Sequence, residues 1–90
     1  MDDTLCPSGR DDLVCEELDG EMIIYDPSTN LTHRLNQSAT FIFLFCDGKT
    51  SLGHIKAFYR NAFRLTDDVA DRDVGFVIEN LSKSSIVSLG

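Results

Sequence analysis

The dipeptide Asp19-Gly20 constrains the fold of this chain most strongly, because it stands between two runs of strand-forming residues. Asp-Gly favours a two-residue turn whose twist matches that of two antiparallel strands. The run LVCEEL at residues 13–18 precedes the turn, and the run EMIIYD at residues 21–26 follows it. The sequence therefore predicts a β-hairpin over residues 13–26.

A third strand is expected over residues 31–35. The four residues before it, Pro27-Ser28-Thr29-Asn30, are turn formers. In the run LTHRL that follows, leucine and histidine alternate with threonine and arginine, which is the period of a half-buried strand. A short strand with one polar face is typical of the edge of a small sheet.

The first of three expected helices runs from Gln37 to about Phe45, with Asn36 as its N-cap. Its centre, FIFLF, is apolar on every side, so this helix is expected to be buried all round and to form the core. Asp47-Gly48 ends it.

Two amphipathic helices are expected next. Thr50 or Ser51 caps the second, and Thr66 caps the third. Apolar residues recur at helical spacing in both: Leu52, Ile55, Phe58 or Tyr59, Ala62 and Phe63, then Ala70, Val74, Val77, Ile78 and Leu81. Ile86 and Val87 close the chain.

These elements predict one α+β domain, in which a three-stranded antiparallel sheet is followed by three helices. This is also the outline of a winged helix-turn-helix. We expect the domain to span residues 13–90. Residues 1–12 contain four aspartates and almost no large apolar residue, so we expect a flexible or loosely docked segment there.

The net charge of −7 bears on the class of partner. Nucleic acids and anionic lipid surfaces are bound by Lys and Arg, so neither is expected as a partner. The chain begins without the features of a signal peptide and contains no apolar run of membrane-spanning length. Its three cysteines are odd in number and lie far apart, which argues against disulfides. We expect a cytoplasmic protein.

No catalytic or metal site is expected. His33, His54 and the cysteines are scattered, and no nucleophile stands near a base in the sequence. The paired close spacing of zinc ligands is missing as well. We therefore expect a non-catalytic binding module without metal or cofactor.

The alternative function is that of a winged-helix DNA-binding or transcription-associated protein. In that fold the third helix reads the major groove. Here its charges oppose contact with phosphates: Asp67, Asp68, Asp71, Asp73 and Glu79 against Arg72 and Lys83. A mobility shift at low salt would separate this alternative from peptide binding.

An edge strand beside an apolar helix is also a groove for an extended peptide. From the residues alone, an ordinary edge strand protected by Arg34 and Thr32 is the more frequent case. The order of signals over residues 18–87, however, resembles the PqqD-like family, the RiPP precursor peptide recognition elements. The matching pieces are Asp19-Gly20, Ile23-Ile24-Tyr25-Asp26-Pro27, Leu35-Asn36-Gln37-Ser38-Ala39, Cys46-Asp47-Gly48-Lys49-Thr50, Ile55 and Asp73-Val74.

The resemblance implies a winged-helix arrangement and a stand-alone, non-catalytic protein. Such a protein acts as a peptide chaperone in natural product biosynthesis, binding the leader region of a ribosomally synthesised precursor peptide by strand addition. It presents that precursor to a separate modifying enzyme, such as a radical SAM enzyme, a cyclodehydratase or a lasso-peptide protease.

The resemblance also implies which residues bind the leader. Strand pairing falls to Leu31, Thr32, His33, Arg34 and Leu35, and the helix wall to Asp73, Val74, Val77, Ile78 and Leu81. Of these, Leu35 and Leu81 are expected to be structural. Thr32, Arg34 and Asp73 are expected to select the partner by polar contacts.

Overall fold

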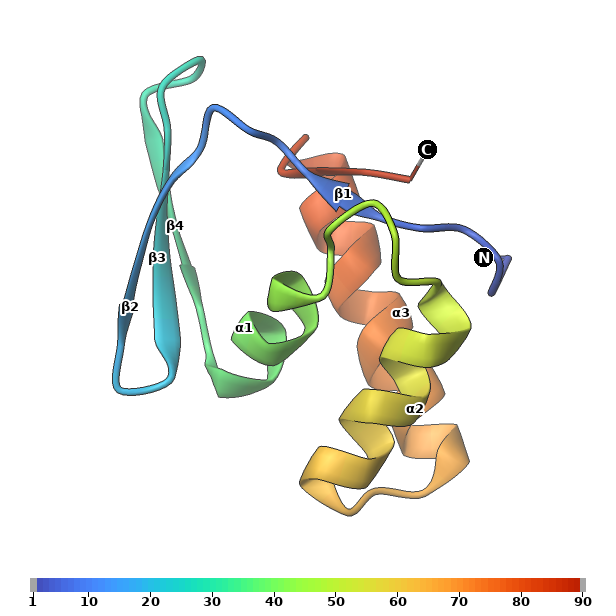
Figure 1. Ribbon diagram of the computed structural model, residues 1–90. Helices are drawn as coiled ribbons and strands as arrows, with labels where there is room; N and C mark the ends of the chain where they lie inside the picture. Colours follow the sequence, from blue (N-terminus) through green and yellow to red (C-terminus); the bar gives the residue numbers. More distant parts are fainter. Residues whose placement is uncertain (1, 90) are drawn as a thin grey trace.

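A computed structural model describes residues 2–89 of the protein (Figure 1). Along the chain, its elements are β1 (Ser8–Gly9), β2 (Val14–Leu18), β3 (Glu21–Asp26), β4 (Leu31–Leu35), α1 (Gln37–Leu44), α2 (Leu52–Phe63), α3 (Asp67–Lys83) and β5 (Val87–Ser88). The predicted α+β order of a three-stranded sheet before three helices is confirmed. No helix among the described residues has both the length and the apolar character of a membrane span.

The three-stranded sheet is antiparallel, with the strand order β2-β3-β4. Asp19 and Gly20 form the first turn with φ angles of 53° and 80°, as the primed hairpin turn requires. Asn30 ends the second turn with a φ of 60°, which asparagine tolerates better than most residues. Both predicted hairpins are therefore present, and β2 and β4 are the two edges of the sheet.

The register determines which backbone groups face each edge. In a two-residue hairpin the closing pair exchanges both backbone hydrogen bonds, and such pairs then alternate with non-bonded pairs along the strands. Alternate residues of β3 therefore bond to β2, and the residues between them bond to β4. This alternation directs the backbone groups of Thr32 and Arg34 away from the sheet at one edge, and those of Cys15 and Glu17 away from it at the other.

Each helix begins at a predicted side-chain cap, and of the two candidates for α2 the cap is Ser51 rather than Thr50. The Asn36 side chain accepts a hydrogen bond from the amide of Ala39 at 2.8 Å. The hydroxyls of Ser51 and Thr66 cap α2 and α3 in the same way. These caps satisfy amide groups that the first turn of a helix leaves without partners.

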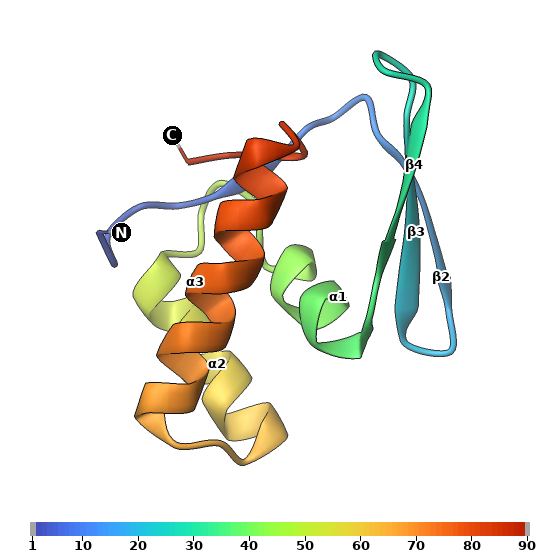
Figure 2. The same ribbon diagram turned by 180° about the vertical axis from the view of Figure 1, so that it is seen from behind.

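Helix α1 lies between the sheet and the pair α2 and α3, as the two opposite views show (Figures 1 and 2). Its Ile42 is fully buried, but Leu44 is exposed and Phe41, Phe43 and Phe45 are only partly buried. The prediction that this helix is buried on every side is therefore wrong. The sheet covers one flank and the other helices cover a second, but within residues 2–89 the domain is too thin to cover the face that carries Leu44.

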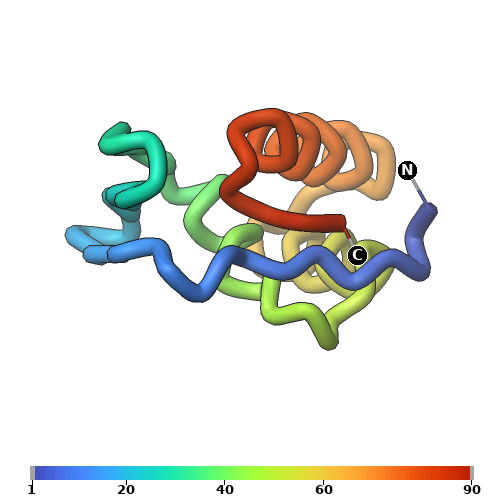
Figure 3. The backbone as a smooth tube through the Cα atoms, turned by 90° about the horizontal axis from the view of Figure 1, so that it is seen from above, coloured from blue at the N-terminus to red at the C-terminus, as the bar shows by residue number. Residues whose placement is uncertain are grey.

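The N-terminal segment crosses the helices beside the C-terminal segment (Figure 3). Ser8 and Gly9 pair with Ser88 and Val87 as β1 and β5. The carbonyl of Leu5 also accepts a hydrogen bond of 2.8 Å from the first amide of α2. The predicted flexibility of residues 1–12, of which Met1 lies outside the described residues, stays a prediction that these contacts oppose.

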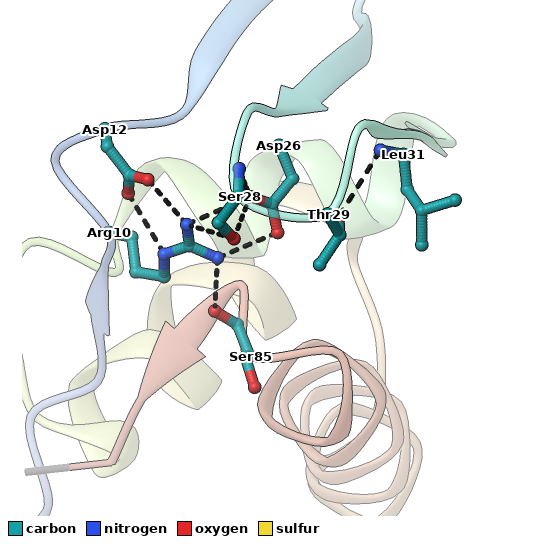
Figure 4. A network of polar contacts seen from close by, with 7 residues as sticks. All are labelled: Arg10, Asp12, Asp26, Ser28, Thr29, Leu31 and Ser85. Carbon is teal, nitrogen blue, oxygen red and sulfur yellow. Dashed lines mark hydrogen bonds and ion pairs between the residues drawn. The ribbon is translucent and has the colours of Figure 1, made fainter.

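Arg10 joins this segment to the sheet (Figure 4). Its guanidinium donates to both carboxylate oxygens of Asp26, at 2.8 and 2.9 Å. The amide and the hydroxyl of Ser28 donate to the same carboxylate, whose side chain is 1% exposed. Arg10 also binds Asp12 and the carbonyl of Ser85, at the end of α3. These donors, Arg10 foremost, hold the pKa of Asp26 far below its usual range.

Replacement of Asp26 by asparagine should lower the free energy of unfolding, because it removes the buried negative charge that pairs with the Arg10 guanidinium. The wild-type contribution is present above pH of about 4, the unfolded pKa of aspartate, and is lost as the pH falls toward the folded pKa. The variant should therefore be less stable than wild type at neutral pH and should lose less stability on acidification. Urea unfolding across this pH range measures both effects.

The matched control is Asp12→Asn, which removes the other aspartate that Arg10 binds. The Asp12 side chain is half exposed, so its removal should change the urea midpoint much less. Equal effects of the two substitutions would show that the buried position of Asp26 is unimportant.

Candidate functional site

A groove of about 400 Å³ lies where the end of β4, the first turn of α1 and the length of α3 meet. The opposite view of the fold shows α1 between β4 and α3 (Figure 2). Asn36 brings these parts together, because it is the single residue between β4 and α1 and its side chain caps α1. The Thr40 hydroxyl donates to the carbonyl of Leu35 at 3.2 Å and fixes this junction.

The wall of the groove on α3 is apolar. Phe76, Val77 and Leu81 line it, and Ala39 faces them from α1. Phe76 is 69% exposed, the largest exposure among the large apolar residues of the described chain. An aromatic ring that stays in water beside a groove is available to a ligand, because covering it removes apolar surface from water.

The polar part of the groove centres on Asp73. The hydroxyl of Tyr59, which is almost wholly buried in α2, donates to the Asp73 carboxylate at 2.9 Å. Burial is the main reason that the pKa of Tyr59 is raised, and Asp73 raises it further. Arg72 lies 3.5 Å from the other carboxylate oxygen. The hydrogen bond from Tyr59 thus ties the position of the Asp73 carboxylate at the groove to α2.

Half of the predicted site residues line this groove: Arg34, Leu35, Asp73, Val77 and Leu81. Leu35 and Leu81 also belong to the buried core, in agreement with their expected structural role. Leu31, Thr32 and His33 lie farther along β4, outside the groove but on the same open edge.

Val74 and Ile78 lie elsewhere. Both are fully buried in the core, where a ligand in the groove does not reach them. The spacing of apolar residues identified the inward face of α3 correctly. It did not separate residues of that face from those at its border, such as Val77, which is only partly buried.

Six lining residues were missed by the sequence reading: Asn36, Ser38, Ala39, Tyr59, Phe76 and Asn80. Phe76 carried a usable signal, since it is an aromatic residue outside the apolar stripe of a helix rich in acids. It also lies three residues after Asp73, on the same face. No signal in the sequence indicated that Tyr59 lines the groove, because its position depends on how α2 packs against α3.

The arrangement offers hydrogen-bonding edges and an apolar wall rather than a reactive group. Burial raises the pKa of Cys46 to about 12, so this thiol stays protonated. The imidazole of His54 is bonded to the hydroxyl of Ser51 at the start of α2. Among the described residues, no cluster of His, Cys, Asp and Glu is arranged to hold a metal ion.

Comparison with protein families identifies one match. The model of the family described as Coenzyme PQQ synthesis protein D (PqqD) matches residues 21–87, from the start of β3 to the first residue of β5. Searches among curated proteins and among solved structures gave no match. The matched residues include β4, α3 and every residue that lines the groove.

Two substitutions on α3 should separate core from groove. Ile78→Ala should lower the free energy of unfolding by about 2–5 kcal/mol, because it leaves a cavity in the core. Phe76→Ala removes an exposed ring and should change it by less than about 0.5 kcal/mol. Urea unfolding measures both, and similar losses for the two variants would place Phe76 in the core instead.

Proposed function

Because the chain belongs to the PqqD family of accessory proteins in coenzyme PQQ and RiPP biosynthesis, we propose that it binds the leader region of a ribosomally synthesised precursor peptide. The leader adds to β4 as a further strand and lies in the groove against α3. The protein then presents the precursor to a separate modifying enzyme. The observation that carries this proposal is the open edge of β4 beside the exposed wall of α3.

The backbone of β4 supports strand addition. The alternation of hydrogen bonds in the sheet directs the amide and carbonyl groups of Thr32 and Arg34 toward solvent at this edge. An extended peptide would satisfy these groups whatever its sequence, and such main-chain bonds supply affinity in strand addition. The β4 residues predicted to pair with the leader therefore act mainly through their backbone.

Selectivity would come from side chains. Alternate residues of an added strand point to opposite faces of the sheet. Those on the face toward α3 would meet Phe76, Val77 and Leu81, so we propose bulky apolar residues there. Leader residues on the other face would meet Thr32 and Arg34. The Arg34 guanidinium donates to Glu21 at 2.8 Å and is well exposed.

The protein would contribute no reaction of its own. A bound leader holds the rest of the precursor close to an enzyme that binds the same accessory protein. Tethering of this kind raises the local concentration of the precursor at that enzyme. Radical SAM enzymes, cyclodehydratases and lasso-peptide proteases are the classes of partner that we propose.

Thr32→Pro tests the strand addition, since it deletes one outward amide of β4 without removing a bond inside the sheet. We expect affinity for the leader to fall by at least about fivefold, the loss of one net hydrogen bond. The measurement is calorimetric titration with a synthetic leader from a short precursor gene beside this one. A scrambled peptide is the control for the ligand.

Glu17→Pro is the matched control for the protein, because it deletes an outward amide at the opposite edge of the same sheet. It should leave leader affinity unchanged. Equal effects of the two prolines, or retained binding in Thr32→Pro, would refute strand addition at β4. Wild-type affinity weaker than micromolar, about −8 kcal/mol, would refute the proposed function.

Arg34→Glu tests the side-chain contacts of the edge. Arg34 is 77% exposed and makes one surface ion pair, so folding should be preserved while leader affinity falls. Lys83→Glu makes the same charge change at a residue that is 72% exposed and also makes one surface pair, but lies outside the groove. Equal affinities of the two variants would exclude Arg34 from the site.

A further inference from the structure

The opposite edge of the sheet, β2, is as open as β4 (Figure 1). All five of its residues are exposed. They pair with β3 in an unbroken register from Val14 to Leu18, without a bulge. The outward backbone groups of Cys15 and Glu17 are therefore arranged to continue the sheet. This strand precedes the residues that match the family model.

The outer face beside this edge is partly apolar. Val14 and Leu18 are 61% and 55% exposed. Tyr25 of β3, which is paired with Val14, is also exposed on that face. Glu16 lies between Val14 and Leu18. The β2 edge thus combines unpaired backbone groups with exposed apolar side chains, and this combination favours protein contacts.

The charge around the β2 edge has one sign. Residues 11–33 contain seven Asp and Glu residues and neither Lys nor Arg. Elsewhere in the sheet the acids are paired, Glu21 with Arg34 and Asp26 with Arg10. Glu16, Glu17 and Asp19 form no ion pair with any residue from 2 to 89. A strand that adds here meets uncompensated negative charge.

A second copy of this chain does not fit the edge. Antiparallel pairing of two β2 strands centred on Glu16 would place Glu16 opposite Glu16. The register centred on Glu17, the other one in which both glutamates remain near the centre of the pair, would place Glu17 opposite Glu17. Like charges directly opposite each other destabilise a sheet. The occupant that the charges favour is instead cationic.

Charged residues on an edge strand can prevent it from pairing with another chain, and Glu16 and Glu17 have this effect between copies of this protein. Protection alone gives no reason for Val14 and Leu18 to stand exposed on either side of Glu16. An interface does, because apolar contacts would flank one acidic residue that the partner neutralises.

We propose that β2 is a second docking edge, which takes a cationic extended segment of another protein as an added strand. Lys or Arg side chains of that segment lie against Glu16 and Glu17, and its apolar side chains cover Val14 and Leu18. The β4 edge stays open meanwhile. The two edges let the sheet connect two polypeptides, and docking at β2 does not depend on the groove at β4.

The first test uses the end-blocked peptide Val-Lys-Lys-Thr-Val as the probe, because an added strand with this pattern can set lysines against Glu16 and Glu17 and valines against Val14 and Leu18. Amide chemical shifts of the protein are followed by NMR during the titration. We expect saturable shifts in residues 14–18, with smaller ones in β4. The same peptide with glutamate in place of lysine should not bind. Binding of the acidic peptide, shifts centred on β4 and the groove, or no shifts at all would overturn the proposal.

Variants then identify the contacts. Glu16→Gln/Glu17→Gln should weaken the lysine peptide by about fivefold, while Asp68→Asn/Glu79→Gln, the same charge change on α3, should have little effect. Glu17→Pro should weaken the probe and Thr32→Pro should not, the reverse of their effects on the leader. Equal losses in both double variants would mean attraction by net charge alone and would refute a site at β2.

Discussion

Asn36 caps α1 one residue after β4 ends, and the position of this junction determines much of the rest of the molecule. Leu35 is held in the core and Thr40 binds its carbonyl, so the chain turns from strand to helix without a loop. Helix α1 therefore leaves the end of β4 at the centre of the domain and carries Ile42 into the core between the sheet and α3. The edge of β4 remains uncovered as a direct consequence.

The thinness of the domain explains the role of the N-terminal segment. Ninety residues bury a limited core, and α1 leaves one of its own faces exposed. Arg10 compensates in part, because its guanidinium joins Asp26 of the sheet to the carbonyl of Ser85 at the end of α3. Backbone pairing of Ser8 and Gly9 with the C-terminal strand adds a second attachment. The segment thus contributes polar contacts where apolar burial is scarce.

Local chemistry made most of the fold predictable. Asp19-Gly20 and the caps Asn36, Ser51 and Thr66 act within a few residues, so the sequence alone locates the hairpin and the helix starts. The pairing of β1 with β5 was not predictable in this way, because backbone hydrogen bonds between distant segments leave little trace in composition. For the same reason the groove was only half predicted. The helical spacing of apolar residues predicts the inward face of α3. The hydrogen bond from Tyr59 to Asp73, in contrast, depends on how α2 packs against α3.

Charge distinguishes the two open edges more sharply than shape does. At β4 the edge carries Arg34, and the wall beside it offers Phe76 with a single acid, Asp73, held by Tyr59. At β2, Glu16 and Glu17 form no ion pair with any described residue. Peptides that differ in charge would therefore prefer different edges of one sheet. Since backbone bonding is equally available at both edges, side-chain charge is what would keep a leader peptide at β4 and a cationic segment of another protein at β2 from exchanging places.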